Sequence, residues 1–253
     1  MRHFSKFLLL SFSLIQLPAI AESAQKPNMQ PQGLTYGLGL AVKREIYKGY
    51  DQRFIPLPVI GYHGEKLSVF GPFISYKLYQ NQQWTFSGLI SPRFEGFDES
   101  DSAYFKDMDD REFSMDAGVG LDYKQASWGV SSKIRTDILG RSNGNEANLN
   151  LTKSYRLGKF TLEPGLGLTY LDENNVDYYY GVRAHEATAD RPFYQASSAV
   201  NKNVTFTAST PMFDGFIRTS VSNTWYDDSI TDSPLTDRDS SLGIMFTYST
   251  FFK

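Results

Sequence analysis

Hydrophobic and polar residues alternate along most of this chain, in short stretches separated by turn residues, and no helical period persists over several turns. Because the side chains of an extended strand point alternately to its two faces, this alternation predicts β-strands. Twelve stretches qualify: Leu34–Lys43, Arg53–Tyr62, Lys66–Phe70, Phe73–Tyr79, Trp84–Phe97, Phe113–Lys124, Trp128–Asp137, Ala147–Arg156, Lys159–Tyr170, Phe193–Thr210, Gly215–Tyr226 and Ser240–Phe252. The expected fold class is all-β.

The connections between these stretches are of two kinds. Tight turns are expected at His63–Glu65, Gln80–Gln83, Gln125–Ser127, Leu157–Gly158 and Pro211–Asp214. Longer polar connections are expected at Arg44–Gln52, Asp98–Glu112, Ile138–Glu146, Leu171–Pro192 and Asp227–Asp239. A chain that starts in the periplasm then places every tight turn there and every long loop outside, which is typical of a single antiparallel transmembrane β-barrel with an even strand number.

The count of about 12 strands depends on a reversal at Gly71-Pro72, which the Gly and Pro residues allow. If Lys66–Tyr79 is instead one bulged strand, the strand count becomes odd and the loops change sides midway, which disfavours that interpretation. A barrel of 10 strands is the alternative to 12. Four prolines lie inside predicted strands and are expected at strand ends or bulges: Pro56, Pro58, Pro92 and Pro164. Glycine pairs spaced by two residues are expected to allow close packing in a narrow barrel: Gly37/Gly39, Gly118/Gly120 and Gly165/Gly167.

The last predicted strand carries an ordered set of small and aromatic residues. Gly243, Phe246 and Tyr248 follow Ser241 in the order polar, glycine, aromatic, aromatic, and Phe252 lies next to the end. This order resembles the closing-strand signal that the barrel-assembly machinery of the outer membrane reads. A soluble β-sandwich that ends on the same residues is the alternative interpretation.

The first residues have the layout of a secretory signal peptide. Arg2, His3 and Lys6 precede an apolar run, and Ala19 and Ala21 supply the small residues before a cleavage point. We therefore expect a signal peptide at residues 1–21, cleaved after Ala21, a short periplasmic segment at 22–33, and the outer-membrane barrel at 34–253. The absence of cysteine excludes lipid attachment through cysteine and any disulfide framework.

Charge and composition agree with a barrel. Without residues 1–21 the chain keeps 23 basic and 28 acidic residues, a net charge of −5, which gives no reason to expect a nucleic-acid partner. Aromatic residues make up 15% of the chain although its mean hydropathy is only −0.37. Strands that face lipid on one side and a polar lumen on the other produce this combination.

No motif predicts catalysis. His63 is expected in a periplasmic turn and His185 in an outer loop, at opposite ends of the barrel. His185-Glu186 lacks the second histidine of a zinc motif, because residue 189 is alanine, and no serine has a nucleophile motif around it. The sequence predicts no catalytic, cofactor-binding or metal site; an outer-membrane hydrolase that uses His185 is the least favoured alternative.

The long outer loops are rich in acidic residues. One loop contains Asp98, Glu99, Asp101, Asp107, Asp109, Asp110 and Glu112, and another contains Asp227, Asp228, Asp232, Asp237 and Asp239. Neither has calcium-loop spacing, since Ala103 stands where glycine is required. A solvated acidic surface is the favoured interpretation, with weak attraction of cations as a hypothesis. Tyr178–Tyr180 are expected to form an interfacial girdle rather than a contact surface, and Gly181 to allow a bend.

Several motifs resemble, in order, those of one family of outer-membrane proteins. They are Gly37–Gly39, Tyr47–Asp51, Pro56–Tyr62, Asp109–Arg111, Asp137–Gly140, Leu162–Gly165, Tyr179–Val182 with Glu186-Ala187, Arg191 and Tyr194, and Ser233–Leu235. The chain resembles the MipA/OmpV family from about residue 34 to its end. Lys253 departs from the family, in which a final phenylalanine is usual.

The resemblance implies a non-enzymatic outer-membrane barrel of a Gram-negative bacterium, in contact with outer-membrane lipid and lipopolysaccharide. One family role is a scaffold that joins a lytic transglycosylase to a peptidoglycan synthase, and the other is a surface protein linked to adhesion and to osmotic or envelope-stress response. A narrow passive pore is the alternative. Candidate interaction residues in the outer loops are Asp98, Asp101, Asp109, Asp110, Tyr179, Tyr180, Gly181, Glu186 and Arg191.

Overall fold

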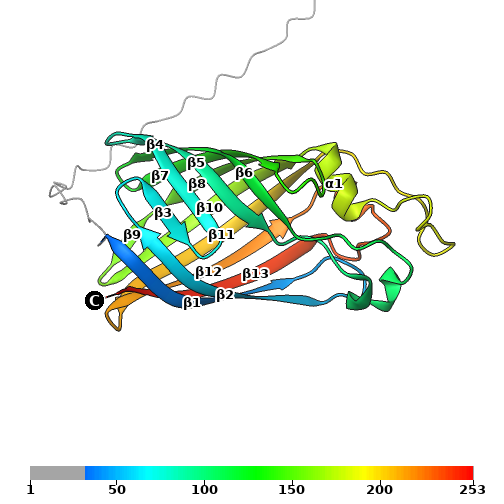
Figure 1. Ribbon diagram of the computed structural model, residues 1–253, viewed down its shortest axis with the longest axis horizontal. Coiled ribbons are helices and arrows are strands. Elements are labelled where there is room, and N and C mark those ends of the chain that lie inside the picture. Colours follow the sequence, from blue (N-terminus) through cyan, green and yellow to red (C-terminus); the bar gives the residue numbers. More distant parts are fainter. Residues whose placement is uncertain (1–31, 253) are drawn as a thin grey trace, which may run out of the picture. The chain divides into compact units, whose positions relative to one another are not determined.

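The computed structural model describes residues 32–252, and these form one antiparallel sheet that closes into a barrel (Figure 1). The strands are β1 (Gly33–Arg44), β2 (Gln52–His63), β3 (Leu67–Phe70), β4 (Phe73–Gln80), β5 (Trp84–Arg93), β6 (Ser114–Gln125), β7 (Trp128–Asp137), β8 (Asn145–Lys153), β9 (Tyr155–Leu157), β10 (Phe160–Leu171), β11 (Ala199–Met212), β12 (Gly215–Trp225) and β13 (Ser240–Phe251). The predicted signal peptide, most of the segment 22–33, and Lys253 lie outside the described residues.

The barrel has twelve strands, as predicted, because β8 and β9 are two parts of one strand. Both pair with β10 in a single register, Gly165 with Thr152 and Leu162 with Tyr155. The interruption between them lies opposite Pro164, which has no N–H to donate to the ladder. Pro164 was expected at a strand end or bulge; it lies inside a strand and removes a hydrogen bond without shifting the register. The reversal at Gly71-Pro72 is confirmed, with Gly71 at φ +55°.

Closure is made by the first and last strands. β1 and β13 pair without a register shift from Thr35 opposite Phe251 to Lys43 opposite Gly243. Gly37 allows this approach, because a Cβ at that position would overlap the carbonyl oxygen of Tyr248. The predicted tight packing at paired glycines is thus observed at the closing strand pair.

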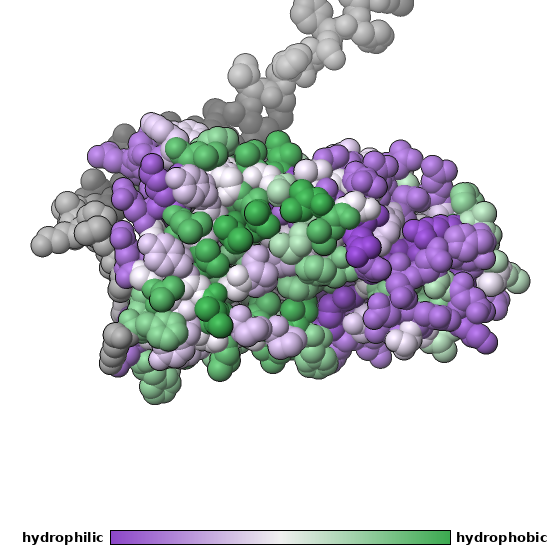
Figure 2. Space-filling model, in the orientation of Figure 1, coloured by the Kyte–Doolittle hydropathy of each residue, from purple (hydrophilic) through white to green (hydrophobic). Residues whose placement is uncertain are grey.

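The outer face of the strands is apolar and the inner face is polar. Apolar side chains exposed on the outside include Leu34, Leu38, Ile60, Ile134, Leu166, Val204 and Ile244. Figure 2 shows hydrophobic residues over the strands, and hydrophilic residues gathered over the long loops at one end. Exposure of so much apolar surface on a folded barrel indicates that lipid surrounds it. No helix within residues 32–252 has the length and apolar character needed to cross a bilayer.

One part of the wall has an incomplete ladder, which we call the seam: residues 52–60 of β2 facing residues 91–93 of β5. β2 pairs with β1 along its whole length but with β3 only at Gly61–His63. β5 pairs with β4 only as far as Ile90, whereas its pairing with β6 continues to Arg93. The β3–β4 hairpin turns at Gly71-Pro72 and does not extend along residues 52–60 of β2. No ladder among the described strands therefore joins β2 to β5.

Prolines line the seam. The carbonyl of Ile60 accepts a hydrogen bond from Gly71 N at 3.3 Å, so the backbone of every second residue of β2, including Pro56 and Pro58, faces the seam. The carbonyl of Trp84 accepts from Asn81 N on the β4 side, and the same alternation places Pro92 there. These prolines were expected at strand ends or bulges. Pro56 and Pro58 instead lie within a strand, on an edge that leaves their missing N–H without consequence.

Two predicted strands are shorter than expected, and the outer loops contain short helices. β5 ends at Arg93 rather than Phe97, and β11 begins at Ala199 rather than Phe193. The loops carry α1 (Glu173–Tyr180), α2 (Asp228–Thr231) and the 3-10 turns η1 (Glu99–Asp101) and η2 (Ala103–Phe105). The predicted all-β fold class is confirmed, and the short helices are confined to the outer loops.

Candidate functional site

Four outer connections, residues 45–51, 94–113, 172–198 and 226–239, fold together into a structure that we call the plug. They supply most of the buried apolar cluster, which consists of Ile46, Tyr47, Phe97, Phe105, Met108, Leu171, Val176, Tyr179, Tyr180, Val182, Ala196, Ala199, Ile230 and Leu235. Figure 1 places these connections together at the end of the barrel away from the C-terminus. The outer end of the barrel is therefore covered by a packed hydrophobic core.

Aromatic rings form the centre of this core. Tyr47 stacks on Tyr180 at 5.4 Å between centroids and meets Phe97 edge-on at 5.2 Å, while Phe97 stacks on Phe105 at 4.1 Å. The hydroxyl of Tyr47 donates to the carbonyl of Tyr179 at 3.1 Å. Burial raises the pKa of both the Tyr47 and Tyr180 hydroxyls, so each remains neutral.

A buried ion pair holds two of the connections together. Arg111 makes a two-pronged contact with Glu186, Nη1 to Oε1 at 2.9 Å and Nη2 to Oε2 at 2.8 Å, with both side chains fully buried. Burial alone would raise the pKa of the Glu186 carboxyl, but the hydrogen bonds from Arg111 outweigh it and the pKa is lowered. Removing one partner of such a pair leaves an uncompensated buried charge, so the pair fixes the plug strongly.

Arg191 joins two outer loops through three backbone carbonyls. Its guanidinium donates to the carbonyl of Glu186 at 2.9 and 3.1 Å, to that of Lys106 at 3.2 Å, and to that of Tyr104. The residue is only 4% exposed. Five donors in one rigid plane allow arginine to satisfy several loop carbonyls at once.

Local sequence explains why the plug segments fold as they do. Asp172 caps α1 by accepting a hydrogen bond from Asn175 N at 3.0 Å, and the helix ends at Gly181, where a Cβ would overlap the carbonyl of Asp177. Gly96 lies at φ +113°, a conformation that favours glycine, and its Cα lies close to the carbonyl of Arg111. These glycines let the connections turn sharply over the barrel end.

The acidic residues of the first long loop act mainly on backbone. Asp101 accepts from Asp98 N at 2.9 Å, and Asp110 accepts from Glu99 N at 2.8 Å. Burial, with the charges of Asp101 and Asp110, raises the pKa of the Asp98 carboxyl. The side chains of Asp98 and Asp110 are exposed, so they contribute to an acidic outer surface.

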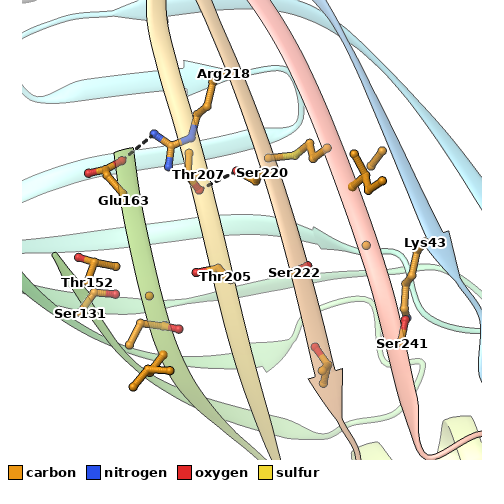
Figure 3. Close-up of a pocket in the computed structure, with 18 of the residues that line it drawn as sticks. Lys43, Ser131, Thr152, Glu163, Thr205, Thr207, Arg218, Ser220, Ser222 and Ser241 are labelled. Atoms are coloured by element: carbon orange, nitrogen blue, oxygen red, sulfur yellow. Dashed lines mark hydrogen bonds and ion pairs between the residues drawn. The ribbon is translucent and has the colours of Figure 1, made fainter. Parts of the chain in front are cut away.

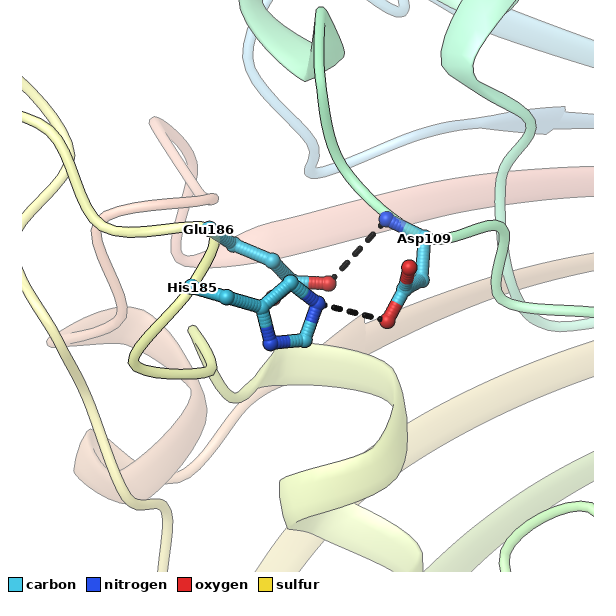
Figure 4. A group of neighbouring side chains, drawn as sticks. All are labelled: Asp109, His185 and Glu186. Carbon is cyan, nitrogen blue, oxygen red and sulfur yellow. Dashed lines mark hydrogen bonds and ion pairs between the residues drawn. The ribbon is translucent and has the colours of Figure 1, made fainter.

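Figure 4 shows Asp109, His185 and Glu186 side by side, close enough for their ligand atoms to meet one ion. Asp109 accepts from Arg183 and contacts His185 Nε2 at 2.9 Å, and both oxygens of Glu186 accept from Arg111. The hydrogen bond from Arg183 lowers the pKa of the Asp109 carboxyl. Because arginines already neutralise both carboxylates, this donor set does not favour a metal ion.

The exposed imidazole of His185 lacks the partners of a catalytic triad. Its hydrogen bond goes to Asp109, and within residues 32–252 no serine or threonine hydroxyl contacts the ring. His63 lies at the opposite end of the barrel, where its Nδ1 is 3.5 Å from the hydroxyl oxygen of Ser68. The two histidines are thus in separate settings, which gives no support to hydrolysis.

Below the plug the barrel encloses a polar lumen of about 680 Å³. Figure 3 shows hydroxyl-bearing side chains of neighbouring strands pointing into it, with Thr207 and Ser220 joined at 2.8 Å and Arg218 near Glu163 at 3.5 Å. These groups leave room for water among them. Between lumen and plug lies a second cavity of about 310 Å³, which we call the chamber, lined by residues of the wall and of α1.

The residues predicted for the outer loops separate into two groups. Tyr179, Tyr180, Gly181, Glu186 and Arg191 are buried in the plug. The predicted tyrosine girdle is therefore wrong for Tyr179 and Tyr180, because α1 turns these rings inward onto the apolar cluster.

The second group, Asp98, Asp101, Asp109 and Asp110, lies on or near the surface of the plug. Tyr47 and Arg111, which the sequence did not single out as site residues, are central to the plug. In the sequence, these two residues were marked only by the family motifs that contain them, Tyr47–Asp51 and Asp109–Arg111.

The predicted assembly signal lies on the closing strand. Phe246 and Phe252 are exposed on the outside of the barrel, and Phe252 packs on Tyr36 at 4.5 Å. Gly243 instead lines the lumen, and Tyr248 donates to the carbonyl of Phe213 at 2.7 Å. Whether this arrangement is read during assembly stays a prediction.

A closed antiparallel barrel with an apolar outer band and a polar lumen defines an outer-membrane β-barrel protein. The family model described as MltA-interacting protein MipA matches residues 36–250, so the chain belongs to this family, and the resemblance drawn from its motifs is confirmed.

Relatives are known from other Gram-negative bacteria. The chain is 31% identical over 222 residues to the putative outer membrane protein YiaT of Escherichia coli, covering 86% of this chain and 88% of that one. It is 27% identical to the MltA-interacting protein of Escherichia coli, covering 85% and 88%, and 27% identical to outer membrane protein OmpV of Vibrio cholerae, covering 76% of each. The protein is accordingly an outer-membrane protein.

Proposed function

We propose that this chain is a non-conducting outer-membrane scaffold whose periplasmic end holds a peptidoglycan-cleaving enzyme. The observation that carries the proposal is the plug: a barrel whose outer end is covered by a packed core is better suited to presenting a surface than to passing solutes. A relative bears the name MltA-interacting protein, and the family resemblance implies a lytic transglycosylase as the partner, with a peptidoglycan synthase as a second one.

The tight turn between β11 and β12 is the best candidate for the contact. Phe213 is 78% exposed and adopts φ +51°, a conformation that is unfavourable for a bulky residue. The hydroxyl of Tyr248 holds it there by donating to the Phe213 carbonyl at 2.7 Å. An exposed aromatic ring held in a strained turn is a candidate binding anchor.

The direct test is binding of a purified lytic transglycosylase to the refolded barrel in detergent, measured by calorimetry. We expect Phe213→Ser to weaken binding at least tenfold. The matched control is Phe193→Ser, which changes an exposed phenylalanine at the outer end and is expected to leave affinity unchanged. Absence of binding, together with no murein enzyme cross-linked to the native protein in cells, would refute the scaffold.

The alternative of a narrow pore is tested in planar bilayers. The plug predicts no reproducible conductance steps from the intact protein, and regular steps would contradict the non-conducting part of the proposal. The second family role, surface interaction, would use the exposed acidic residues of the plug, among them Asp98 and Asp110. Replacing both by asparagine should then reduce attachment of whole cells to host surfaces while transglycosylase binding stays the same.

A further inference from the structure

The chamber between plug and lumen has the features of a ligand site. Its volume of about 310 Å³ is at the lower end of the range of small-molecule pockets. Lys43 and Thr224 line both the chamber and the larger lumen, so the two cavities adjoin at these residues. Tyr179 and Tyr180 of α1 separate it from the outside.

Most of the charged groups in the chamber wall neutralise one another. Arg93 contacts Asp116 at 2.6 Å and Glu146 at 2.6 Å, and Arg135 contacts the other oxygen of Glu146. These four side chains form a network of ion pairs, and the two other charged side chains of the chamber make no ion pair with it.

The two remaining charges are Glu95 and Lys43. Within the described part of the chain, Glu95 forms no ion pair and no hydrogen bond with another residue. Lys43 has only Glu45 at 3.7 Å, and Glu45 is already held by Arg53 at 2.6 Å. Burial opposes ionisation of Glu95, but the charges of Lys43, Arg93 and Arg53 outweigh it and lower the pKa of its carboxyl. The chamber therefore contains an ionised carboxylate, Glu95, that forms no ion pair with a described residue, and an ammonium group, Lys43, whose one ion-pair partner, Glu45, it shares with Arg53.

An independent observation comes from Asn175 on α1. This residue lines the chamber and is only 1% exposed, yet its side-chain nitrogen Nδ2 has no hydrogen-bond partner. Leaving a buried donor unsatisfied costs about 1–3 kcal/mol, which an acceptor on a bound molecule would relieve. The Nε of Arg135, which also lines the chamber, is buried without a partner as well.

We propose that the chamber binds a free α-amino acid with a neutral, apolar side chain, which enters through the lumen. The carboxylate of Glu95 receives its ammonium group, and Lys43 together with the amide of Asn175 receives its carboxylate. An α-amino acid carries both charged groups on one carbon, which suits a site of no net charge in which one carboxylate forms no ion pair with a described residue and one ammonium group shares its partner. Tyr179, Tyr180 and Leu171 provide apolar surface for the side chain.

The test uses the refolded full-length protein in detergent and isothermal calorimetry with L- and D-leucine. We expect saturable binding of at least one enantiomer, and at least tenfold weaker binding of its N-acetyl and its amide derivative, which lack the ammonium and the carboxylate respectively. Absence of saturable heat with millimolar leucine would overturn the proposal. Equal binding of the free amino acid and either derivative would overturn the two-ended recognition on which it depends.

Two variants and a control connect the signal to the chamber. Glu95→Gln keeps the size of the side chain and removes its charge, and Lys43→Met does the same for the cation; each should weaken leucine binding at least tenfold. Glu163→Gln, in the lumen outside the chamber, should bind as the unaltered protein does. Equal affinity in all three variants would refute the assignment. If a variant fails to fold, as judged by heat-modifiable migration, the comparison of leucine with its two derivatives on the unaltered protein still tests whether both charged groups of the amino acid are recognised.

Discussion

In the plug, connections far apart in sequence meet around stacked rings and a buried ion pair; in the lumen, neighbouring strands present hydroxyl groups to a space of about 680 Å³. Both regions belong to the same barrel, but side chains of the plug pack against one another, whereas side chains of the lumen surround a cavity. Plug residues are packed on all sides, so each contact affects the fold of the others. Lumen residues are positioned by the backbone ladder, so a single change affects little else.

Breaking the buried ion pair is expected to have the largest effect. Arg111→Met leaves the buried Glu186 carboxylate without its charged partner and with only the backbone N–H groups of Asp109 and Arg183, at a cost of about 3–5 kcal/mol to the plug. The wall should remain folded, because its ladders do not involve this pair. We expect intact heat-modifiable migration, rapid proteolysis within residues 94–113 and 172–198, and conductance steps in planar bilayers.

The matched control is Arg183→Met, which removes the exposed contact with Asp109 and is expected to change proteolysis little. A double variant, Arg111→Met with Glu186→Leu, should recover much of the lost protection, since it removes both buried charges together. Equal sensitivity of the Arg111 and Arg183 variants would contradict the role given to the pair.

Loss of a buried ring comes next. Phe105 is completely buried in the plug, and Phe105→Ala should destabilise it by about 3 kcal/mol through the cavity left behind. Phe193→Ala, at an exposed position of another plug connection, serves as the control and should cost far less. Protease digestion at increasing urea concentration compares the two, and similar midpoints would show that the plug is not a packed core.

Acid should loosen the plug while the lumen and wall stay as they are. The pKa of the Glu186 carboxyl is lower in the folded protein than in an unfolded chain, where it is about 4.3. Its contribution is fully present above that unfolded value and is lost as the pH falls through the lower folded value. Protease sensitivity of the plug should rise below about pH 4 and remain constant from pH 6 to 8, and Glu186→Gln should reduce the acid dependence to the part contributed by the other plug carboxylates with lowered pKa values, Asp109 and Glu95.

The smallest effect is expected in the lumen. Thr207→Ala removes one hydrogen bond, 2.8 Å long, to Ser220, where water takes over the exposed partner. The expected cost is about 0.5 kcal/mol in the free energy of unfolding, measured by tryptophan fluorescence in urea. A loss comparable to that of Phe105→Ala would remove the distinction between the two regions.

The strands that form the barrel wall could be predicted from the sequence, because the alternation of apolar and polar residues that marks them is a local pattern. Alternation located β1, β7 and β13 to within one or two residues, and the Gly71-Pro72 reversal set the strand count. The same rule failed where alternation continued past the barrel. Phe97 extended the predicted fifth strand, but its ring is buried in the plug because the chain has already turned at Gly96.

The plug could not be predicted because its contacts join distant segments. Arg111 and Glu186 are 75 residues apart, and Tyr47 and the Tyr179 carbonyl are 132 apart. Nothing in the pattern around Tyr179 and Tyr180 distinguishes rings that face lipid headgroups from rings that face a core. The chamber depends in addition on which charges remain unpaired after folding, and that is fixed only by the full set of contacts.

The seam gives this barrel a short length of free rim in an otherwise closed sheet. An exposed strand edge normally offers N–H groups on which another strand can add, and Pro56 and Pro58 remove two of these groups from the exposed edge of β2. We therefore expect these prolines to disfavour strand pairing between neighbouring copies of the protein along this edge. The seam has fewer hydrogen bonds between neighbouring strands than the rest of the barrel. We therefore expect the barrel to deform most easily there when the thickness of the surrounding bilayer changes.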